Sequence, residues 1–130
     1  NLSVTIGTAG SIGLVLQALL IPAVKTNLHI SINGGATYGK FAPPVHHFDH
    51  VLFPLLAKMH FSPKLDVLKH GFYPRGGAAV DVMTKKTTLK PLHIPEKGKI
   101  ISITGISIAS KDLAKAEVAE RQAKQAKQFQ

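Results

Sequence analysis

Hydrophobic and polar residues alternate in some segments of this chain and follow helical spacing in others. Alternation is typical of half-buried strands, whereas apolar residues at i, i+3 and i+4 are typical of helices. The pattern predicts strands at residues 2–6, 28–33, 65–69 and 79–83, and helices at 12–23 and 45–59. Pro54 lies inside the second helical segment, so we expect it to kink or divide that helix. Residues 2–84 are therefore predicted to run strand, helix, strand, helix, strand, strand.

A further strand is predicted near residues 99–108. Ile101 and Ile103 share one parity, while Ile106 and Ile108 share the other. Gly105 lies at the change of parity, so we expect a β-bulge there.

The last segment is predicted to be a helix capped by Ser110 or Asp112. Its inner stripe would consist of Leu113, Ala116, Ala119, Ala123 and Ala126. This second strand and helix suggest one repeat unit over residues 2–84 and the start of another over 99–129. Alternation of this kind indicates an α/β class, with helices packed on one face of each sheet.

Size and charge narrow the class of protein. A chain of 130 residues with 45% hydrophobic residues can form one domain with a real core. The formal charge of +9 favours polyanionic partners, nucleic acid above all. The sequence has no cysteine, which excludes disulfides, thiolate catalysis and cysteine-based zinc sites. It starts at Asn1 without a methionine and stops at Gln130 within a helical pattern, so we expect an internal fragment.

The first predicted helix is too short to be a membrane span. The apolar run from Ile12 to Val24 falls short of the about 20 residues that a bilayer requires, so no membrane association is expected. Gln17 is the one long polar side chain in this run. If its amide is buried, it needs a partner. Chemistry alone favours a structural partner over a ligand.

Two glycine-rich turns are candidates for anion binding. Gly7, Gly10 and Gly13 follow the first strand, but their spacing matches neither the dinucleotide fingerprint nor the P-loop. The second turn, His70 to Gly77, joins two predicted strands as a hairpin. Its Arg75 offers a planar fork of donors suited to phosphate or carboxylate. The alternative is a tight turn with a solvated arginine.

A histidine pair raises the question of a metal site. His46 and His50 are four residues apart in a predicted helix, with Asp49 beside them. Such a pair can bind a metal on one helical face, but no third ligand is apparent and the His-Glu-x-x-His pattern is absent. Solvated side chains are therefore favoured over a metal site.

Four blocks of the sequence together resemble the RNA 3'-terminal phosphate cyclase family. The hairpin turn matches its signature at His70, Gly71, Pro74, Gly76, Gly77 and Val80, with Ala78 in place of the usual third glycine. The segment 7–17, which ends in Leu-Val-Leu-Gln, is similar to a second block. Gly34-Gly35, Ala42-Pro43-Pro44 and residues 54–59 are similar to a third, and residues 118–121 to a helix of the family.

The resemblance implies a fold of three βαβαββ repeats with a smaller α/β domain inserted in the third. Residues 1–130 would then be a single piece of the repeat domain, without the inserted domain or the termini. The implied activity uses ATP and Mg²⁺ or Mn²⁺ to convert an RNA 3'-phosphate into a 2',3'-cyclic phosphate. Enzyme-AMP and RNA-adenylate intermediates lie on the implied route.

The resemblance also implies roles for particular residues. Gln17 and Pro44 would bind ATP, with the proline packed beside the adenine. His70, Arg75, Gly76 and Gly77 would lie near the phosphate or the RNA. The nucleophilic histidine of the family belongs to a motif that these residues lack, so no catalytic residue is assigned here. We therefore expect the chain alone to be inactive.

Two other interpretations of the sequence remain open. One is a non-catalytic relative that binds pre-ribosomal RNA during ribosome assembly. The other is a generic basic RNA-binding domain. For the cyclase reading, the expected partners are RNA 3'-phosphate ends and the remaining segments of the same enzyme, and a homodimer stays open. The expected location is the cytoplasm, or the nucleus in a eukaryote.

Overall fold

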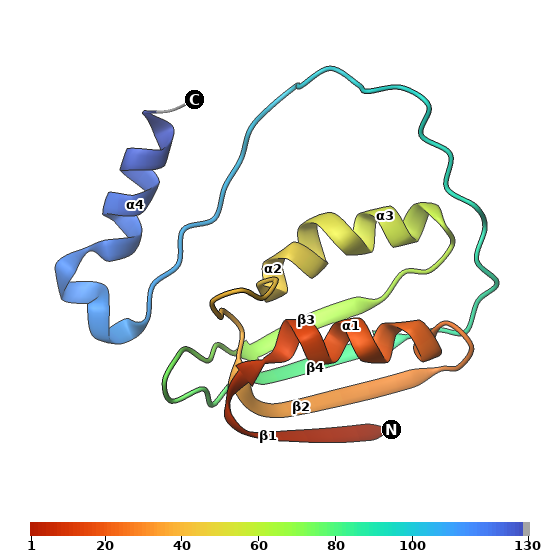
Figure 1. The fold of residues 1–130 in the computed structure, drawn as a ribbon, viewed down its shortest axis with the longest axis horizontal. Coiled ribbons are helices and arrows are strands. Elements are labelled where there is room, and N and C mark those ends of the chain that lie inside the picture. The colour runs from red at the N-terminus through yellow and green to blue at the C-terminus, as the bar shows by residue number, and fades with distance from the viewer. Residues whose placement is uncertain (129–130) are drawn as a thin grey trace. The chain divides into compact units, whose positions relative to one another are not determined.

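The computed structural model describes residues 1–128, which form a mixed α/β structure (Figure 1). Its elements are, in chain order, β1 (Leu2–Ser11), α1 (Ile12–Ala23), β2 (Leu28–Ala36), α2 (Val45–His47), a π-helical turn (Phe48–Leu52), α3 (Phe53–Lys58), β3 (Lys64–Lys69), β4 (Ala79–Thr84), a 3₁₀ helix (Lys111–Ala116) and α4 (Val118–Lys127). Over residues 2–84 this is the predicted order of strands and helices. No helix in the described residues is long and apolar enough to cross a bilayer.

The four strands form one mixed sheet in the order β1-β2-β4-β3. β1 runs parallel to β2, while β4 is antiparallel to both of its neighbours. Parallel strands need a crossover connection, and α1 supplies it between β1 and β2. The second helical segment likewise connects β2 to β3, so both crossovers contain helix.

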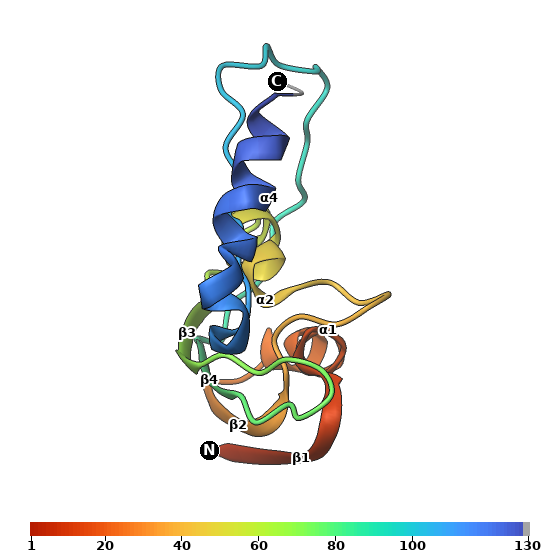
Figure 2. The same cartoon turned by 90° about the vertical axis from the view of Figure 1, so that its left-hand side faces the viewer.

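One face of the sheet packs against the helices and forms the core. α1 and the segment α2 to α3 lie on the same side of the curved sheet (Figure 2). The strand residues facing them are apolar and buried, as the alternation predicted; examples are Ile30, Ile32, Val80 and Val82. The helices contribute Ile12, Leu16, Leu20, Val45, Phe48 and Phe53. The opposite face carries polar residues, among them Ser31 and Asp81.

Both helical segments begin as the sequence predicts. Ser11 caps α1, because its hydroxyl oxygen accepts a hydrogen bond from the backbone N–H of Leu14 at 3.3 Å. The second segment is divided, also as predicted, and Pro54 lies at the start of α3. The division takes the form of a π-helical turn between α2 and α3. Proline fits the start of a helix, where its missing N–H is not needed.

The strand predicted around Ile101 to Ile108 does not form, and with it the bulge at Gly105 is lost. Residues 85–110 contain neither helix nor strand. A strand needs a partner for its backbone N–H and C=O groups, and within the described residues none pairs with this segment. Ile101 is accordingly 96% exposed. Residues 99–108 thus have the alternation of a strand but no neighbouring strand to pair with within the described residues.

Contacts divide the chain into two compact units, Asn1–His93 and Ile94–Gln130. In the second unit, Ser110 precedes the 3₁₀ helix, so the predicted start is confirmed, although the Ser110 side chain makes no capping bond. Glu117, in the left-handed region with φ of 48°, separates this turn from α4. The predicted inner stripe is not buried. Residue 129, the predicted end of this segment, lies outside the described residues.

Candidate functional site

Three loops rich in glycine meet at one end of the sheet (Figure 1). They are residues 7–11, which were predicted as a turn but form the irregular end of β1 where its pairing with β2 shifts register, residues 34–45 around the end of β2, and the hairpin turn 70–78 between β3 and β4. Gly76, with φ of 66°, lies so close to the first loop that an added Cβ would be 2.8 Å from the carbonyl oxygen of Thr8 and 2.9 Å from that of Gly35. An L side chain fits neither this conformation nor this space. The glycines therefore permit close backbone packing of all three loops.

Thr37 ties the second loop to the hairpin turn. It is buried, and its backbone N–H donates to the carbonyl oxygen of Gly71 at 2.9 Å. Its hydroxyl lies 3.1 Å from the same oxygen and accepts from the Gly71 N–H at 3.3 Å. The Thr37 carbonyl in turn accepts from the N–H of Val45 at the start of α2. One residue thus fixes the turn, the loop and the helix relative to one another.

Rings from both loops form a stacked cluster around Thr37. Tyr38 lies over Phe72 with ring centroids 5.5 Å apart and an interplanar angle of 13°. His46 stacks on His70 at 5.7 Å, and its Nδ1 lies 2.5 Å from the Tyr38 hydroxyl. His46 is therefore engaged in the cluster, contrary to the expectation of a merely solvated side chain.

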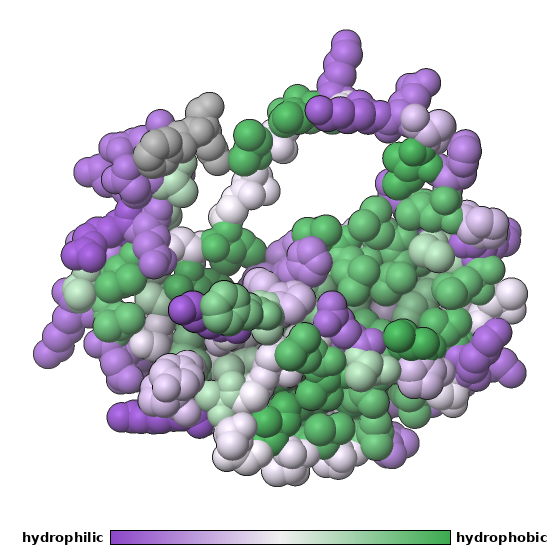
Figure 3. Space-filling view, viewed as in Figure 1, coloured by the Kyte–Doolittle hydropathy of each residue, from purple (hydrophilic) through white to green (hydrophobic). Residues whose placement is uncertain are grey.

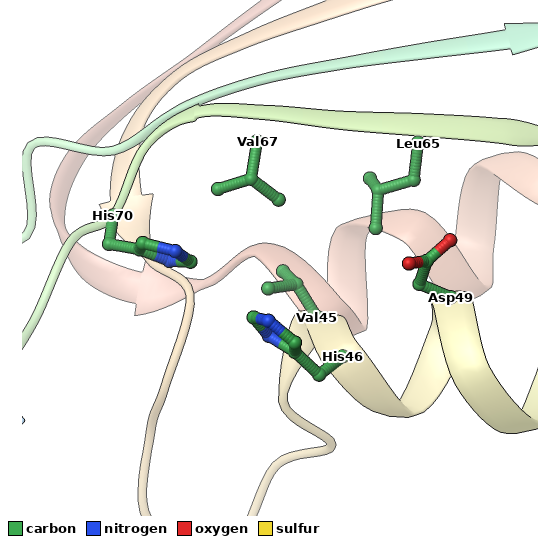
Figure 4. A pocket seen from close by; sticks show the side chains of 6 residues that line it. All are labelled: Val45, His46, Asp49, Leu65, Val67 and His70. Atoms are coloured by element: carbon green, nitrogen blue, oxygen red, sulfur yellow. The ribbon is translucent and has the colours of Figure 1, made fainter. Parts of the chain in front are cut away.

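His46 and His70 also line a small pocket (Figure 4). Its volume is about 220 Å³, and Val45, Asp49, Leu65 and Val67 complete its wall. His46 and His70 point toward one another across its mouth, from α2 and from the end of β3 (Figure 4). The pocket is small next to the about 300 to 1,000 Å³ of a typical ligand site. It fits small groups better than a whole nucleotide.

The two imidazoles influence one another electrostatically. Partial burial, and then the neighbouring His46, lower the pKa of His70 below its ordinary value. Both effects disfavour the charged imidazolium. Burial also raises the pKa of Tyr38. Both shifts favour the neutral forms of His70 and Tyr38.

A metal site at the histidines has no support in the arrangement of ligands. Among residues 1–128, no group of three or more His, Asp, Glu or Cys side chains is placed to hold a metal ion. His50 is exposed and lies 3.9 Å from the neighbouring Asp49.

The predicted phosphate- or RNA-proximal residues are gathered by the fold. His70, Arg75, Gly76 and Gly77 all belong to the hairpin turn. Gly76 and Gly77 adopt positive φ, as their residue type allows. Arg75 is exposed, and in the described part of the chain it has no carboxylate partner. No Asp or Glu occurs in loops 7–11, 34–45 or 70–78, so Arg75 and Lys40 leave this end positively charged.

The Pro43-Pro44 segment packs against α1 at Gly13, one turn before Gln17. Gly13 carries no side chain there, and a Cβ would overlap the carbonyl oxygen of Pro43. Gln17 follows Gly13 by four residues, about one helical turn further along the same face. Gln17 is exposed, so its amide needs no buried partner. The reason is that α1 is covered by the sheet on one side only.

Gln17 borders an apolar cleft between α1 and α3. The cleft has a volume of about 530 Å³ and is lined by Gln17, Leu20, Ile21, Val24, Lys25, Leu52, Leu56, Phe61 and Leu89. Hydrophobic residues spread over the molecular face that contains α1 (Figure 3). Ile21 is 77% and Leu14 54% exposed. A helix that is apolar all round is usually buried on all sides.

Sequence reasoning missed Thr37, Tyr38 and Phe72. A threonine after two glycines has no pattern of its own, and its partner Gly71 is 34 residues away. The available signal was weak: aromatic or histidine residues flank both loops, at Tyr38, His46, His70 and Phe72.

Comparison with known proteins identifies the family. The model of the RNA 3'-terminal phosphate cyclase family matches residues 1–129. The RNA 3'-terminal phosphate cyclase of Halobacterium salinarum is 40% identical over 123 residues, which is 93% of this chain and 36% of that protein. The one from Caldivirga maquilingensis is 40% identical over 131 residues, or 98% of this chain and 36% of that protein. The one from Pseudomonas fluorescens is 39% identical over 98 residues, or 74% and 28%.

The chain therefore spans about a third of the length of the two archaeal relatives. The matched residues include all three loops at the end of the sheet and the segment that follows the sheet. On the match of residues 1–129, the chain belongs to the RNA 3'-terminal phosphate cyclase family.

Proposed function

We propose that this chain is part of an RNA 3'-terminal phosphate cyclase, which converts an RNA 3'-phosphate into a 2',3'-cyclic phosphate at the expense of ATP. The observation that carries the proposal is the family match over residues 1–129. Residues 2–84 would form one βαβαββ repeat and residues 99–129 the start of the next. The proposed location is the cytoplasm, or the nucleus in a eukaryote.

The convergence of the three loops supports this function. The reaction handles phosphates on both substrates, so it requires positive charge and backbone donors to offset theirs. Arg75 supplies the charge from the hairpin turn, and Gly76 and Gly77 allow close approach to its backbone. His70 lies at the base of the same turn. We assign these four residues to the phosphate- or RNA-proximal surface.

The nucleotide would lie against α1. Gln17 is exposed there, with its amide free of any hydrogen bond within the described residues, and Gly13, one turn before it, packs against the carbonyl of Pro43, which precedes Pro44. These residues fit a nucleobase, because an amide can donate and accept while the proline ring offers an apolar surface. ATP would supply the leaving group that activates the RNA phosphate. Mg²⁺ or Mn²⁺ would accompany it.

The apolar face of α1 also fits this proposal. The archaeal relatives are about three times as long as the chain. Exposed side chains such as Leu14 and Ile21 would be covered by the remaining segments of the same enzyme, which we propose as its partner. Covering this face is worth about 25 cal/mol for each Å² of apolar surface removed from water.

A chimaera tests the function directly. The segment of the Caldivirga maquilingensis cyclase that aligns with this chain is replaced by residues 1–130. Cyclisation of a 3'-phosphorylated RNA is then measured by resistance of the end to phosphatase. We expect activity within about ten-fold of the parent, since the matched blocks are retained. A folded chimaera without activity would contradict the cyclase proposal and favour the non-catalytic alternative that binds pre-ribosomal RNA.

The isolated chain provides the complementary test. Because the family's nucleophilic histidine motif is missing from these residues, we expect no covalent adduct with AMP. The chain is incubated with ATP labelled in the α-phosphate and with Mg²⁺, then resolved on a denaturing gel. A labelled band at its mass would show that one of its seven histidines, or another residue, acts as the nucleophile.

A further inference from the structure

Two aromatic side chains at the loop end of the sheet are left in solvent. Phe41 is 93% exposed and Tyr73 is 82% exposed. The other phenylalanine and tyrosine residues that the structure describes are buried or partly covered. Exposing a large ring costs free energy that burial would recover. The fold nevertheless holds both rings outward.

The backbone at Phe41 makes this exposure more unusual. Its φ of 63° lies in the left-handed region, which bulky residues rarely adopt. Strain of this kind persists where the surrounding structure fixes it, and it occurs often at binding sites.

The two rings belong to loops that are joined at their base. Tyr38 pairs with Phe72 in an isolated parallel bridge, and their rings stack. Phe41 follows three residues after Tyr38, and Tyr73 directly follows Phe72. Both loops lie at the same end of the sheet in the two perpendicular views (Figure 1, Figure 2). The stacked pair thus serves as a rigid base for two exposed rings.

Positive charge accompanies each ring. The Lys40 ammonium lies 5.0 Å from the centroid of the Phe41 ring. Arg75 is two residues beyond Tyr73, and neither loop contains an acidic residue. Aromatic rings beside Lys and Arg are the features with which proteins bind single-stranded nucleic acid, since bases stack on the rings and phosphates pair with the cations.

We propose that Phe41 and Tyr73 form a stacking platform for the bases next to the 3' end of a single-stranded RNA, with Lys40 and Arg75 on its phosphates. This rests on the proposed function, and it specifies how the RNA is held. RNA fits better than a protein partner because the chain carries a charge of +9 and the loops are purely basic. Stacking tolerates any base, so the platform recognises a strand without selecting its sequence.

The experiment compares two probes that differ only in their bases. One is a 3'-phosphorylated oligouridylate of about eight nucleotides, within the range of single-strand site sizes. The other is an abasic ribose-phosphate oligomer of the same length and charge. Affinity of the full chain for each is measured by fluorescence anisotropy over a range of salt. We expect the oligouridylate to bind at least about ten-fold tighter, from two stacked bases.

The double variant Phe41→Ala/Tyr73→Ala should abolish that difference while leaving the salt dependence unchanged. The variant Phe41→Tyr/Tyr73→Phe keeps both rings and should restore it. Lys40→Ala/Arg75→Ala should weaken both probes and reduce the salt slope by about 0.7 for each lost phosphate contact. As a matched control, Ile101→Ala/Ile103→Ala removes exposed apolar side chains elsewhere. It should alter neither the affinity difference between the two probes nor the salt dependence.

Equal affinity of wild type for the two probes would overturn the platform, as would a difference that survives in Phe41→Ala/Tyr73→Ala. Circular dichroism of each variant excludes loss of fold as the cause. The proposed function fails separately, if the chimaera with the Caldivirga maquilingensis cyclase is folded but inactive. If the chimaera is active but the wild-type chain binds both probes equally, the cyclase proposal holds and the stacking platform is contradicted.

Discussion

The backbone N–H of Thr37 donates a hydrogen bond to the carbonyl oxygen of Gly71 across two loops, and the hydroxyl of the buried threonine accepts one from the glycine N–H. The same hydroxyl lies 3.3 Å from Nδ1 of His70. This pair joins the hairpin turn to the loop that leads to Pro44. The two groups of residues assigned to RNA and to nucleotide are thereby coupled through one side chain.

Thr37→Val should destabilise the chain. Valine has the same shape but leaves the buried N–H of Gly71 without its hydroxyl partner, which costs about 1–3 kcal/mol. The free energy of unfolding is measured by urea titration followed by circular dichroism. Thr5→Val is the matched control, because Thr5 is exposed on β1, and its change should stay within about 0.5 kcal/mol. Equal stability of Thr37→Val and wild type would mean that the hydroxyl contributes nothing to the junction.

Gly76→Ala and Gly77→Ala should lower the free energy of unfolding by different amounts, although both positions have positive φ. A Cβ at Gly77 would meet nothing within 4 Å, so its cost is the backbone term of about 1–2 kcal/mol. A Cβ at Gly76 would press on the Thr8 carbonyl at 2.8 Å and must also shift the loops. We expect Gly76→Ala to lose more in urea unfolding than Gly77→Ala. The reverse order would contradict the close packing of the hairpin turn on residues 7–11 at the end of β1.

Gly13→Ala should displace the Pro43-Pro44 segment, because a Cβ at Gly13 overlaps the Pro43 carbonyl. Overpacking of this kind costs about 1–3 kcal/mol. Within the active chimaera we expect the apparent KM for ATP to rise by about ten-fold, the equivalent of about 1.4 kcal/mol. Gly7→Ala serves as the control, since a Cβ there has nothing within 4 Å. An unchanged KM for ATP in Gly13→Ala would argue against a nucleotide beside Pro44.

Acid should weaken the junction through His70. Its pKa is lowered in the folded chain, by partial burial and by His46, relative to an unfolded value of about 6.5. The stabilising neutral state is therefore fully present above about pH 6.5, and its contribution is lost as the pH falls from there through the folded pKa. Urea unfolding at descending pH should show less of this loss in His70→Asn. His93→Asn, at an exposed histidine, should behave as wild type.

Local patterns sufficed for the secondary structure of residues 2–84. The Ser11 cap, the extent of α1 and the division at Pro54 depend on neighbouring residues, so the sequence expresses them directly. The exposure of Gln17 could not be predicted, because the sequence of an apolar helix does not reveal that one of its sides lacks a covering layer. The strand at Ile101 failed for a related reason: pairing depends on a distant partner, which alternation does not specify.

The candidate site was only partly predictable for the same reason. The hairpin turn and its glycines stood out in the sequence, whereas Thr37, which holds the turn in place, is 34 residues from its partner. His46 appeared to be half of a weak metal pattern. In the structure the His46 imidazole stacks on the rings of Tyr38 and His70. Contacts between loops of this kind are set by the fold as a whole.

The π-helical turn Phe48–Leu52 accommodates one residue more than a regular α-helix would over the same segment. Val45 and Phe53 are eight residues apart, which in a regular α-helix would rotate them about 80° from one another at about 100° per residue. Both are nevertheless buried, because the wider turn absorbs one residue. Deleting one residue from this turn would leave a regular α-helix with both side chains still facing the core. The turn is therefore the place in this segment where deletion of a single residue leaves the rest of the domain in phase.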